Sequence, residues 1–285
     1  MDGCDDMTGE GLVAALRGCA GVLRIFANYT SCEDGDGRCN LTPELVAKLV
    51  AACPELECAA CVVDCCGLAE AVRVAAALPG PLELCIVELD DDSDATVRPY
   101  GFIHGLLLKS VTTLNLDTYV GLSQAEILTL GEALRVNNSL TSLVINTNFN
   151  DNGDEIFDDC AANAVALGGA LRLNSTLTSL KLYRHSVDDI CAVMLSDTLR
   201  VNNTLKSLNV GGNNIGDGGA TALSDALRVN STLTHLGLHH NGIGGSGAAS
   251  LVDAMRVNCT LATLYLWSDN DTAFKDSPSE RDARD

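Results

Sequence analysis

The sequence is short of the features that mark membrane-bound and nucleic-acid-binding proteins. Its 285 residues include 18 Lys and Arg against 38 Asp and Glu, a formal net charge of −20. Phosphate binding needs clustered Lys and Arg, so this balance argues against nucleic acid and anionic membranes as partners. No apolar run approaches the length of a membrane span. The acidic excess favours a basic protein partner, or serves solubility alone.

The first residues also lack the positive charge and apolar core of a secretory signal, because the segment MDGCDDMTGEG is acidic. The chain has 13 cysteines, an odd number. Without a signal we expect most of them to be reduced and buried as small apolar side chains. These observations favour a cytoplasmic location.

What the sequence contains is a repeat. Three clear copies of the pattern L-x-x-L-x-L-x-x-N begin at Leu140, Leu205 and Leu233. Two copies that depart only at the last place begin at Leu177 and Leu261, and weaker copies begin at positions 20, 53, 82 and 111. The alternation of apolar residues predicts one short strand in each of these nine copies. In the weaker copies the pattern aligns Cys85 and Val87 with Leu114 and Leu116, and places Ile86 on the outward side.

A helix is expected after each strand. Apolar residues recur with helical period in each copy, as in Ala220, Leu223 and Leu227 and, one copy later, Ala248, Leu251 and Met255. The outer face carries an acid three residues before an arginine, which offsets repulsion between stacked arginines. These pairs are Glu132 and Arg135, Asp197 and Arg200, Asp225 and Arg228, and Asp253 and Arg256.

One strand–helix unit cannot bury its own leucines, so neighbouring units must stack. Strands stack about 4.8 Å apart and helices are about 10 Å wide, so the array must curve with the strands inside. The predicted fold class is therefore an α/β leucine-rich-repeat solenoid, a horseshoe with parallel strands on the concave face and helices on the convex face. The predicted boundaries are a capping helix in 1–19, about nine repeats in 20–268 and a disordered tail in 269–285.

Asparagines recur at two places in the unit. The asparagine at the ninth position is expected to hydrogen-bond the backbone of the turn, where no strand ladder exists. Glycosylation sequons such as the one at Asn174 and the one at Asn230 fall inside the recurring segment RVNxT. We interpret them as a by-product of the repeat and not as glycan sites.

The unit LxxLxLxxNxIGDxGAxALxxALRVNxT resembles the ribonuclease-inhibitor class of leucine-rich repeat. That class also occurs in the sensing region of NOD-like immune receptors and in the Ran GTPase-activating protein. The resemblance is strong from Leu140 to Asn270 and extends back to Ala20. It implies a horseshoe that binds macromolecules on its concave face. No Walker motif is present, which argues against a receptor's nucleotide-binding domain in this chain.

The side chains beside the inward leucines vary from copy to copy, and they point to the concave face. In a chain that is 4% aromatic with a single tryptophan, Tyr, Trp and Arg gathered on one exposed face are typical of interface anchors. We predict these partner-binding residues: Tyr183, Arg184, His235, His239, His240, Tyr265 and Trp267. An alternative for Tyr265 and Trp267 is that they cover the apolar end of the last repeat.

Candidate metal sites are weak. Cys58 and Cys61 form one C-x-x-C without the second pair that a zinc site needs, and both fall on positions of the repeat itself. The loop from Asn148 to Asp159 approaches a calcium-binding pattern but has Asn at its first place and follows a strand instead of a helix, which favours a solvated acidic loop. The histidines from His235 to His240 are interpreted as surface groups and not as metal ligands.

Motifs of catalysis are absent too: the chain has no phosphate loop and no G-x-S-x-G. We expect no catalytic residue, no metal, no cofactor and no enzymatic activity. The sequence thus predicts a protein-interaction scaffold that binds a protein partner on its concave strands. The alternative is a regulator of a small GTPase, like the Ran GTPase-activating protein. The oligomeric state does not follow from the sequence.

Overall fold

The structure is a computed structural model. It describes the backbone of residues 21–27, 56–64, 82–87, 111–118, 122, 124–147, 160–185 and 187–266, and the side chains of 111–116, 122, 124–146, 164–185 and 187–266. The chain divides into two compact units, Met1–Ile156 (unit 1) and Phe157–Asp285 (unit 2). The expected capping helix in 1–19 and the expected tail in 269–285 lie outside the described residues.

The described residues of unit 1 form five strands that pair in parallel and in chain order. They are β1 (Gly21–Ala27), β2 (Leu56–Asp64), β3 (Leu82–Val87), β4 (Val111–Thr118) and β5 (Ser142–Thr147). The helix α5 (Gln124–Val136) joins β4 to β5 and buries its apolar face. Leu114 pairs with Leu143 and Leu116 with Ile145, as the repeat predicts.

The register of the earlier strands differs from the prediction. Leu84 and Ile86 of β3, not Cys85 and Val87, pair with Leu114 and Leu116, after an irregularity between Leu82 and Glu83. The predicted alignment of Cys85 and Val87 with Leu114 and Leu116 is therefore wrong by one residue. In β2 the strand continues to Asp64, so Cys61 lies inside the strand and not at the ninth place. In these copies several alternations of apolar residues are possible, and a shift of one residue exchanges the two faces of a strand.

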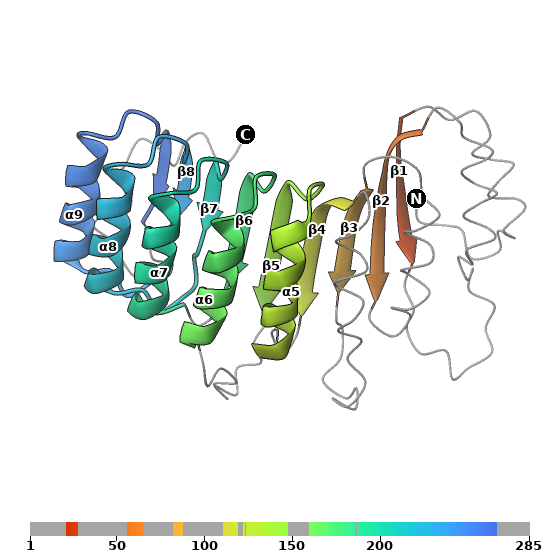
Figure 1. Ribbon diagram of the computed structural model, residues 1–285, viewed down its shortest axis with the longest axis horizontal. Coiled ribbons are helices and arrows are strands. Elements are labelled where there is room, and N and C mark those ends of the chain that lie inside the picture. Colours follow the sequence, from red (N-terminus) through yellow and green to blue (C-terminus); the bar gives the residue numbers. More distant parts are fainter. Residues whose placement is uncertain are drawn as a thin grey trace, which may run out of the picture. The chain divides into compact units, whose positions relative to one another are not determined.

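Unit 2 alternates helices and strands throughout (Figure 1). Its elements are α6 (Cys160–Leu171), β6 (Ser179–Tyr183), α7 (Asp189–Leu199), β7 (Ser207–Asn209), α8 (Asp217–Leu227), β8 (His235–Gly237), α9 (Gly245–Met255) and β9 (Thr263–Tyr265). The strands are parallel and in chain order, and the helices pack side by side along one side of them. This arrangement is the predicted α/β leucine-rich-repeat solenoid.

The core of unit 2 lies between these two layers. Leu180, Leu208 and Leu236 stand level in successive strands and are all buried. From the helix side α8 contributes the predicted apolar face, because Ala220, Leu223 and Leu227 are fully buried. Burying one such leucine contributes about 1.5–3 kcal/mol, so the repeated positions carry most of the apolar stabilisation.

Met255 departs from the predicted core. It occupies in α9 the place that Leu227 occupies in α8, yet it is 36% exposed. The physical reason is its position in the stack: α8 packs between α7 and α9, whereas among the described residues no helix packs on the far side of α9.

The ninth-position asparagines bond the backbone of the turns, which confirms the prediction. Asn213 donates from Nδ2 to the carbonyl oxygens of Leu182, Val210 and Gly211, and its Oδ1 accepts from the amides of His185 and Val187. Asn241 repeats the pattern one unit later. One amide side chain thus satisfies backbone groups of two successive repeats.

A second asparagine ladder lies after the helices, at the sequon positions. Asn230 accepts at Oδ1 from the amides of Thr232 and Leu233, and donates from Nδ2 to the carbonyls of Leu199 and Asn202 in the preceding repeat. Asn174 and Asn230 are 5% and 6% exposed. These buried amides hold backbone groups of the repeat in place, so the asparagine of this position has a structural role.

Two cysteines of the described part of the chain differ in state, where most were expected to be reduced and buried. Cys191, buried in α7, is disulfide-bonded, and its partner lies outside the described side chains. Cys259 is an exposed, reduced thiol.

Candidate functional site

The strand face of unit 2 is the side of its strands that the helices leave open. In β6 buried leucines alternate with the partly exposed Ser179, Lys181 and Tyr183. The corresponding places in the next strands, which complete what we call the strand face, are Ser207, Asn209 and Gly211, then His235, Gly237 and His239, then Thr263 and Tyr265. Alternation within each strand therefore puts the recurring leucines in the core and puts residues that vary from repeat to repeat on the strand face.

Aromatic rings from alternate repeats meet on this face. The rings of Tyr183 and His239 are stacked, with their centroids 6.0 Å apart and their planes at 27°. His239 also meets His240 edge-on at 5.4 Å. We call these residues, with the neighbouring Lys181 and Arg184, the ring cluster. Such ring pairs contribute about 0.5–1.5 kcal/mol beyond the area that they bury.

The ring cluster depends on a glycine. Tyr183, Gly211 and His239 occupy the same place in three successive repeats, 28 residues apart. Strands two repeats apart are separated by about 9.6 Å, farther than two stacked rings. Gly211 leaves room for the His239 ring, because an added Cβ there would collide with that ring. A Cβ on Gly212 would come within 2.8 Å of the Tyr183 ring.

Two cations flank the tyrosine of the ring cluster. The Lys181 Nζ lies 5.3 Å from the centroid of the Tyr183 ring, and the Arg184 Cζ lies 5.5 Å from it. Both distances fit cation–π attraction. Lys181 was not among the predicted site residues. Its signal was present in the sequence, because it precedes Tyr183 by two residues and strand alternation puts both on one face.

The turn after each strand holds a left-handed backbone at one place. Arg184, Gly212 and His240 have φ angles of 58°, 68° and 53°. Glycine adopts this conformation without steric cost, whereas other residues lose about 1–2 kcal/mol. Two members of the ring cluster, Arg184 and His240, therefore occupy positions where glycine would fit the backbone better.

Burial lowers the pKa of two histidines here, His239 and His185. Burial lowers the pKa of His239, and the nearby His240 and Lys181 lower it further. Burial also lowers the pKa of His185, from its ordinary 6.5 to about 4. Both rings are thus neutral at pH 7 and available as hydrogen-bonding and stacking groups.

The remaining predicted residues are less tightly grouped. His235 is exposed on β8, where its Nδ1 lies 2.8 Å from the Thr234 hydroxyl. Tyr265 is 39% exposed on β9 and pairs through its backbone with Gly237. Trp267 lies outside the described residues, and so does the loop from Asn148 to Asp159. The structure therefore brings together Tyr183, Arg184, His239 and His240 of the predicted set.

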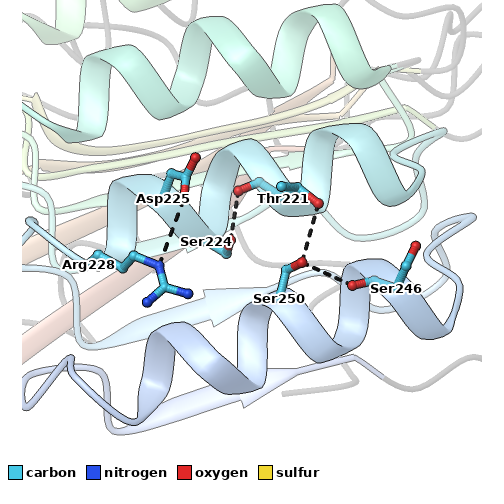
Figure 2. Close-up of polar contacts among 6 residues, drawn as sticks. All are labelled: Thr221, Ser224, Asp225, Arg228, Ser246 and Ser250. Carbon is cyan, nitrogen blue, oxygen red and sulfur yellow. Dashed lines mark hydrogen bonds and ion pairs between the residues drawn. The ribbon is translucent and has the colours of Figure 1, made fainter.

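The helix side of unit 2 has a different chemistry, in which polar groups satisfy one another (Figure 2). The Thr221 hydroxyl of α8 donates to that of Ser250 on α9 over 3.4 Å, and Ser250 donates to the carbonyl of Ser246. The Arg228 Nε lies 3.8 Å from Asp225. The corresponding pairs Asp197–Arg200 and Asp253–Arg256 are 3.9 and 3.3 Å apart, so three of the predicted acid–arginine pairs are confirmed.

Within the described part of the chain, no three His, Cys, Asp or Glu side chains are grouped as they would be around a metal ion. Likewise, no helix of the described residues is long and apolar enough to cross a membrane.

Two stretches of unit 2, residues 201–224 and 229–252, match the model of the family described as Leucine Rich repeat. These two stretches are thus leucine-rich repeats, in agreement with their strand–helix architecture. No curated protein matches the chain significantly.

Several solved structures are similar to parts of the chain. The actin-binding site 2 of leiomodin-1 is 27% identical, with a TM-score of 0.41 over 50% of this chain and 77% of that one. The tropomodulin C-terminal domain of Caenorhabditis elegans is 14% identical, with a TM-score of 0.44 over 56% and 93%. A Bacteroides fragilis protein is 13% identical, with a TM-score of 0.43 over 76% and 66%. At these scores the similarities assign no function to the chain.

Proposed function

We propose that this protein is a non-catalytic scaffold that binds a protein partner on its strand face, with the ring cluster as the main anchor. The proposed partner-binding residues are those predicted from the sequence: Tyr183, Arg184, His235, His239, His240, Tyr265 and Trp267. Lys181 joins them because it flanks Tyr183. The ribonuclease-inhibitor class and the relation to NOD-like receptors stay part of this proposal.

The observation that carries the proposal is the assembly of the ring cluster itself. Tyr183 and His239 come from repeats that are not neighbours, and they meet because Gly211 leaves room. Partly exposed aromatic rings with a neighbouring arginine are typical of the residues that dominate binding energy at protein interfaces.

Backbone strain supports the same reading. Arg184 and His240 hold left-handed φ angles that glycine would adopt at no cost. Strained backbone of this kind clusters at functional sites, where side-chain chemistry outweighs a small loss of stability. The aspartate–arginine pairs on the helix side, in contrast, serve to stabilise the helices.

The test is affinity capture from the native cell with three baits: the wild-type chain, Tyr183→Ala/His239→Ala, and Ile190→Ala. Ile190 is 58% exposed on α7 and serves as the control, because it changes a surface away from the strand face. A true partner should bind the wild type and the control equally. It should lose more than about 2 kcal/mol, roughly thirtyfold, on the double variant when the purified pair is titrated calorimetrically.

Partners that bind all three baits with equal affinity would reject the ring cluster as the binding site. No observation on the described residues favours the GTPase-regulator alternative, and we do not propose it.

A further inference from the structure

We propose that the strand face of unit 2 binds an acidic peptide segment of its partner. This inference rests on the proposed function and deepens it, because it names the chemistry that the partner presents. It also differs from the expectation that the composition raised, since a chain with a net charge of −20 favours a basic partner at long range.

The strand face carries basic side chains and no carboxylates. Lys181 and Arg184 lie on either side of the Tyr183 ring, and His235, His239 and His240 stand on the same face or in the turn that continues it. The strand-face positions from Ser179 to Tyr265, and the turn residues that follow β6, β7 and β8 at 184–185, 212–213 and 240–241, include no Asp or Glu. In a chain with twice as many acids as bases, this local excess of positive charge is unusual.

Three arginines on the helix side of unit 2 have acidic partners within the protein. On the helix side, Arg200, Arg228 and Arg256 each lie within 4 Å of an aspartate three residues earlier. No ion pair among the described residues involves Lys181 or Arg184. These three arginines have an acidic partner within the protein, whereas Lys181 and Arg184 can take one from a ligand.

The geometry of these groups suits carboxylates on a peptide. A guanidinium binds a carboxylate through two parallel hydrogen bonds, and Arg184 is exposed with its guanidinium beside an aromatic ring. The stacked Tyr183 and His239 rings offer apolar area for the neighbouring side chains of the segment. Each acid bound here would also favour protonation of the adjacent histidines.

Nucleic acid shares the negative charge but fits less well. Its affinity depends on neutralising many phosphates, and the strand face offers two permanent cations. The surrounding charge of −20 repels a long polyanion. A short acidic segment adds few charges, and at physiological salt the repulsion from charges farther than about 8 Å is largely screened.

The experiment is a selection of random linear peptides displayed on phage against the immobilised full-length chain. Binders should be enriched in Asp and Glu. Synthetic copies of the selected peptides should bind Lys181→Gln/Arg184→Gln about tenfold more weakly, or worse. They should bind the matched control Arg228→Gln/Arg256→Gln, which removes two cations from the helix side, with unchanged affinity. Circular dichroism of each variant verifies that it is folded.

Three results would overturn the inference. Acidic binders that are insensitive to Lys181→Gln/Arg184→Gln would show that the acids bind elsewhere. Selected peptides without acidic enrichment that are lost on Tyr183→Ala/His239→Ala would overturn the acidic segment while supporting the proposed function. A single-stranded oligonucleotide that binds the same cations more tightly than the best peptide would replace the peptide with nucleic acid.

A selection in which no binder depends on either double variant would count against both the acidic segment and the strand face. Failure of the acidic segment alone is thus distinguishable from failure of the proposed function, because only the latter removes the dependence of binding on Tyr183 and His239.

Discussion

At the scale of single residues, the structure shows how one place in the repeat changes its role with the amino acid that fills it. The ninth position holds Asn213 and Asn241 in successive repeats, and each satisfies the backbone of a turn. One repeat earlier the same place holds His185, whose burial lowers its pKa from 6.5 to about 4. His185 therefore makes the stability of the protein depend on pH.

The direction follows from the two states. The unfolded chain binds a proton on His185 near pH 6.5, and the folded chain does so only near pH 4. As the pH falls from about 6.5 to 4, the unfolded state gains more protons and the free energy of unfolding falls, by up to about 3 kcal/mol.

We predict that His185→Asn, which restores the usual residue of this place, reduces that acid-induced loss. The measurement is urea unfolding at pH 7 and pH 4 for the wild type, His185→Asn and the exposed control His235→Asn. If His185→Asn and the wild type lose equal stability on acidification, the result contradicts a lowered pKa of His185 in the folded protein.

Gly211 shows why part of the site escaped prediction at this scale. Strand alternation placed Tyr183 and His239 on one face, but residues in alternate strands are not expected to touch. Their contact requires the intervening side chain to be absent, and it is, at Gly211. A glycine level with two aromatic residues in the neighbouring repeats is a readable signal, although the angle and distance of the rings come from the structure.

At the scale of elements, helices α8 and α9 are capped by the repeat before them. Their N-cap residues are Gly216 and Gly244, and neither has a side chain to bond the first turn. Asp189 of α7 accepts from the Gly216 amide over 2.7 Å, and Asp217 of α8 accepts from the amides of Gly244 and Gly247 over 2.8 Å. Helix capping thus links consecutive repeats, which makes their folding cooperative.

We predict that Asp217→Ala speeds hydrogen exchange in the first turn of α9 more than in α8, although the substitution lies in α8. The hydroxyl of Ser246 and the amide of Gly247 lower the pKa of Asp217, so its cap is present above that pKa and is lost in acid. The measurement is hydrogen exchange by mass spectrometry on peptides of each helix. The control is Asp225→Ala, also in α8, which should leave exchange in the first turn of α9 unchanged. Faster exchange confined to α8 would show that the cap is local.

The elements also show how far sequence reasoning reaches. All four strands of unit 2 lie where the leucine pattern predicts them, with Leu180, Leu208, Leu236 and Leu264 level with one another. The predicted register of β3 was wrong by one residue. Leu84, Cys85, Ile86 and Val87 are four apolar residues in a row, so no alternation with polar residues indicates which of them belong to the core. A pattern fixes register where apolar and polar residues alternate, and loses it where they do not.

At the scale of the whole molecule, the repeated positions stabilise the stack and the varied positions form the strand face. The leucines and asparagines that recur hold neighbouring repeats together, and they can be read from the sequence because every copy repeats the same information. The strand face of unit 2 carries no such repetition, since each copy differs there. Its residues could be assigned to a face from the sequence, but their assembly into one cluster could not.

The ring cluster is the central claim, and histidine NMR tests it without knowledge of the partner. Because His239 is half-buried beside Tyr183, Lys181 and His240, its pKa should lie below the ordinary value. Its ring protons should show nuclear Overhauser contacts to the Tyr183 ring. The variant Tyr183→Ala, which exposes the imidazole, should raise that pKa towards the ordinary value. The ring cluster would be contradicted if His239 had an ordinary pKa, showed no contact to the Tyr183 ring, and kept the same pKa in Tyr183→Ala.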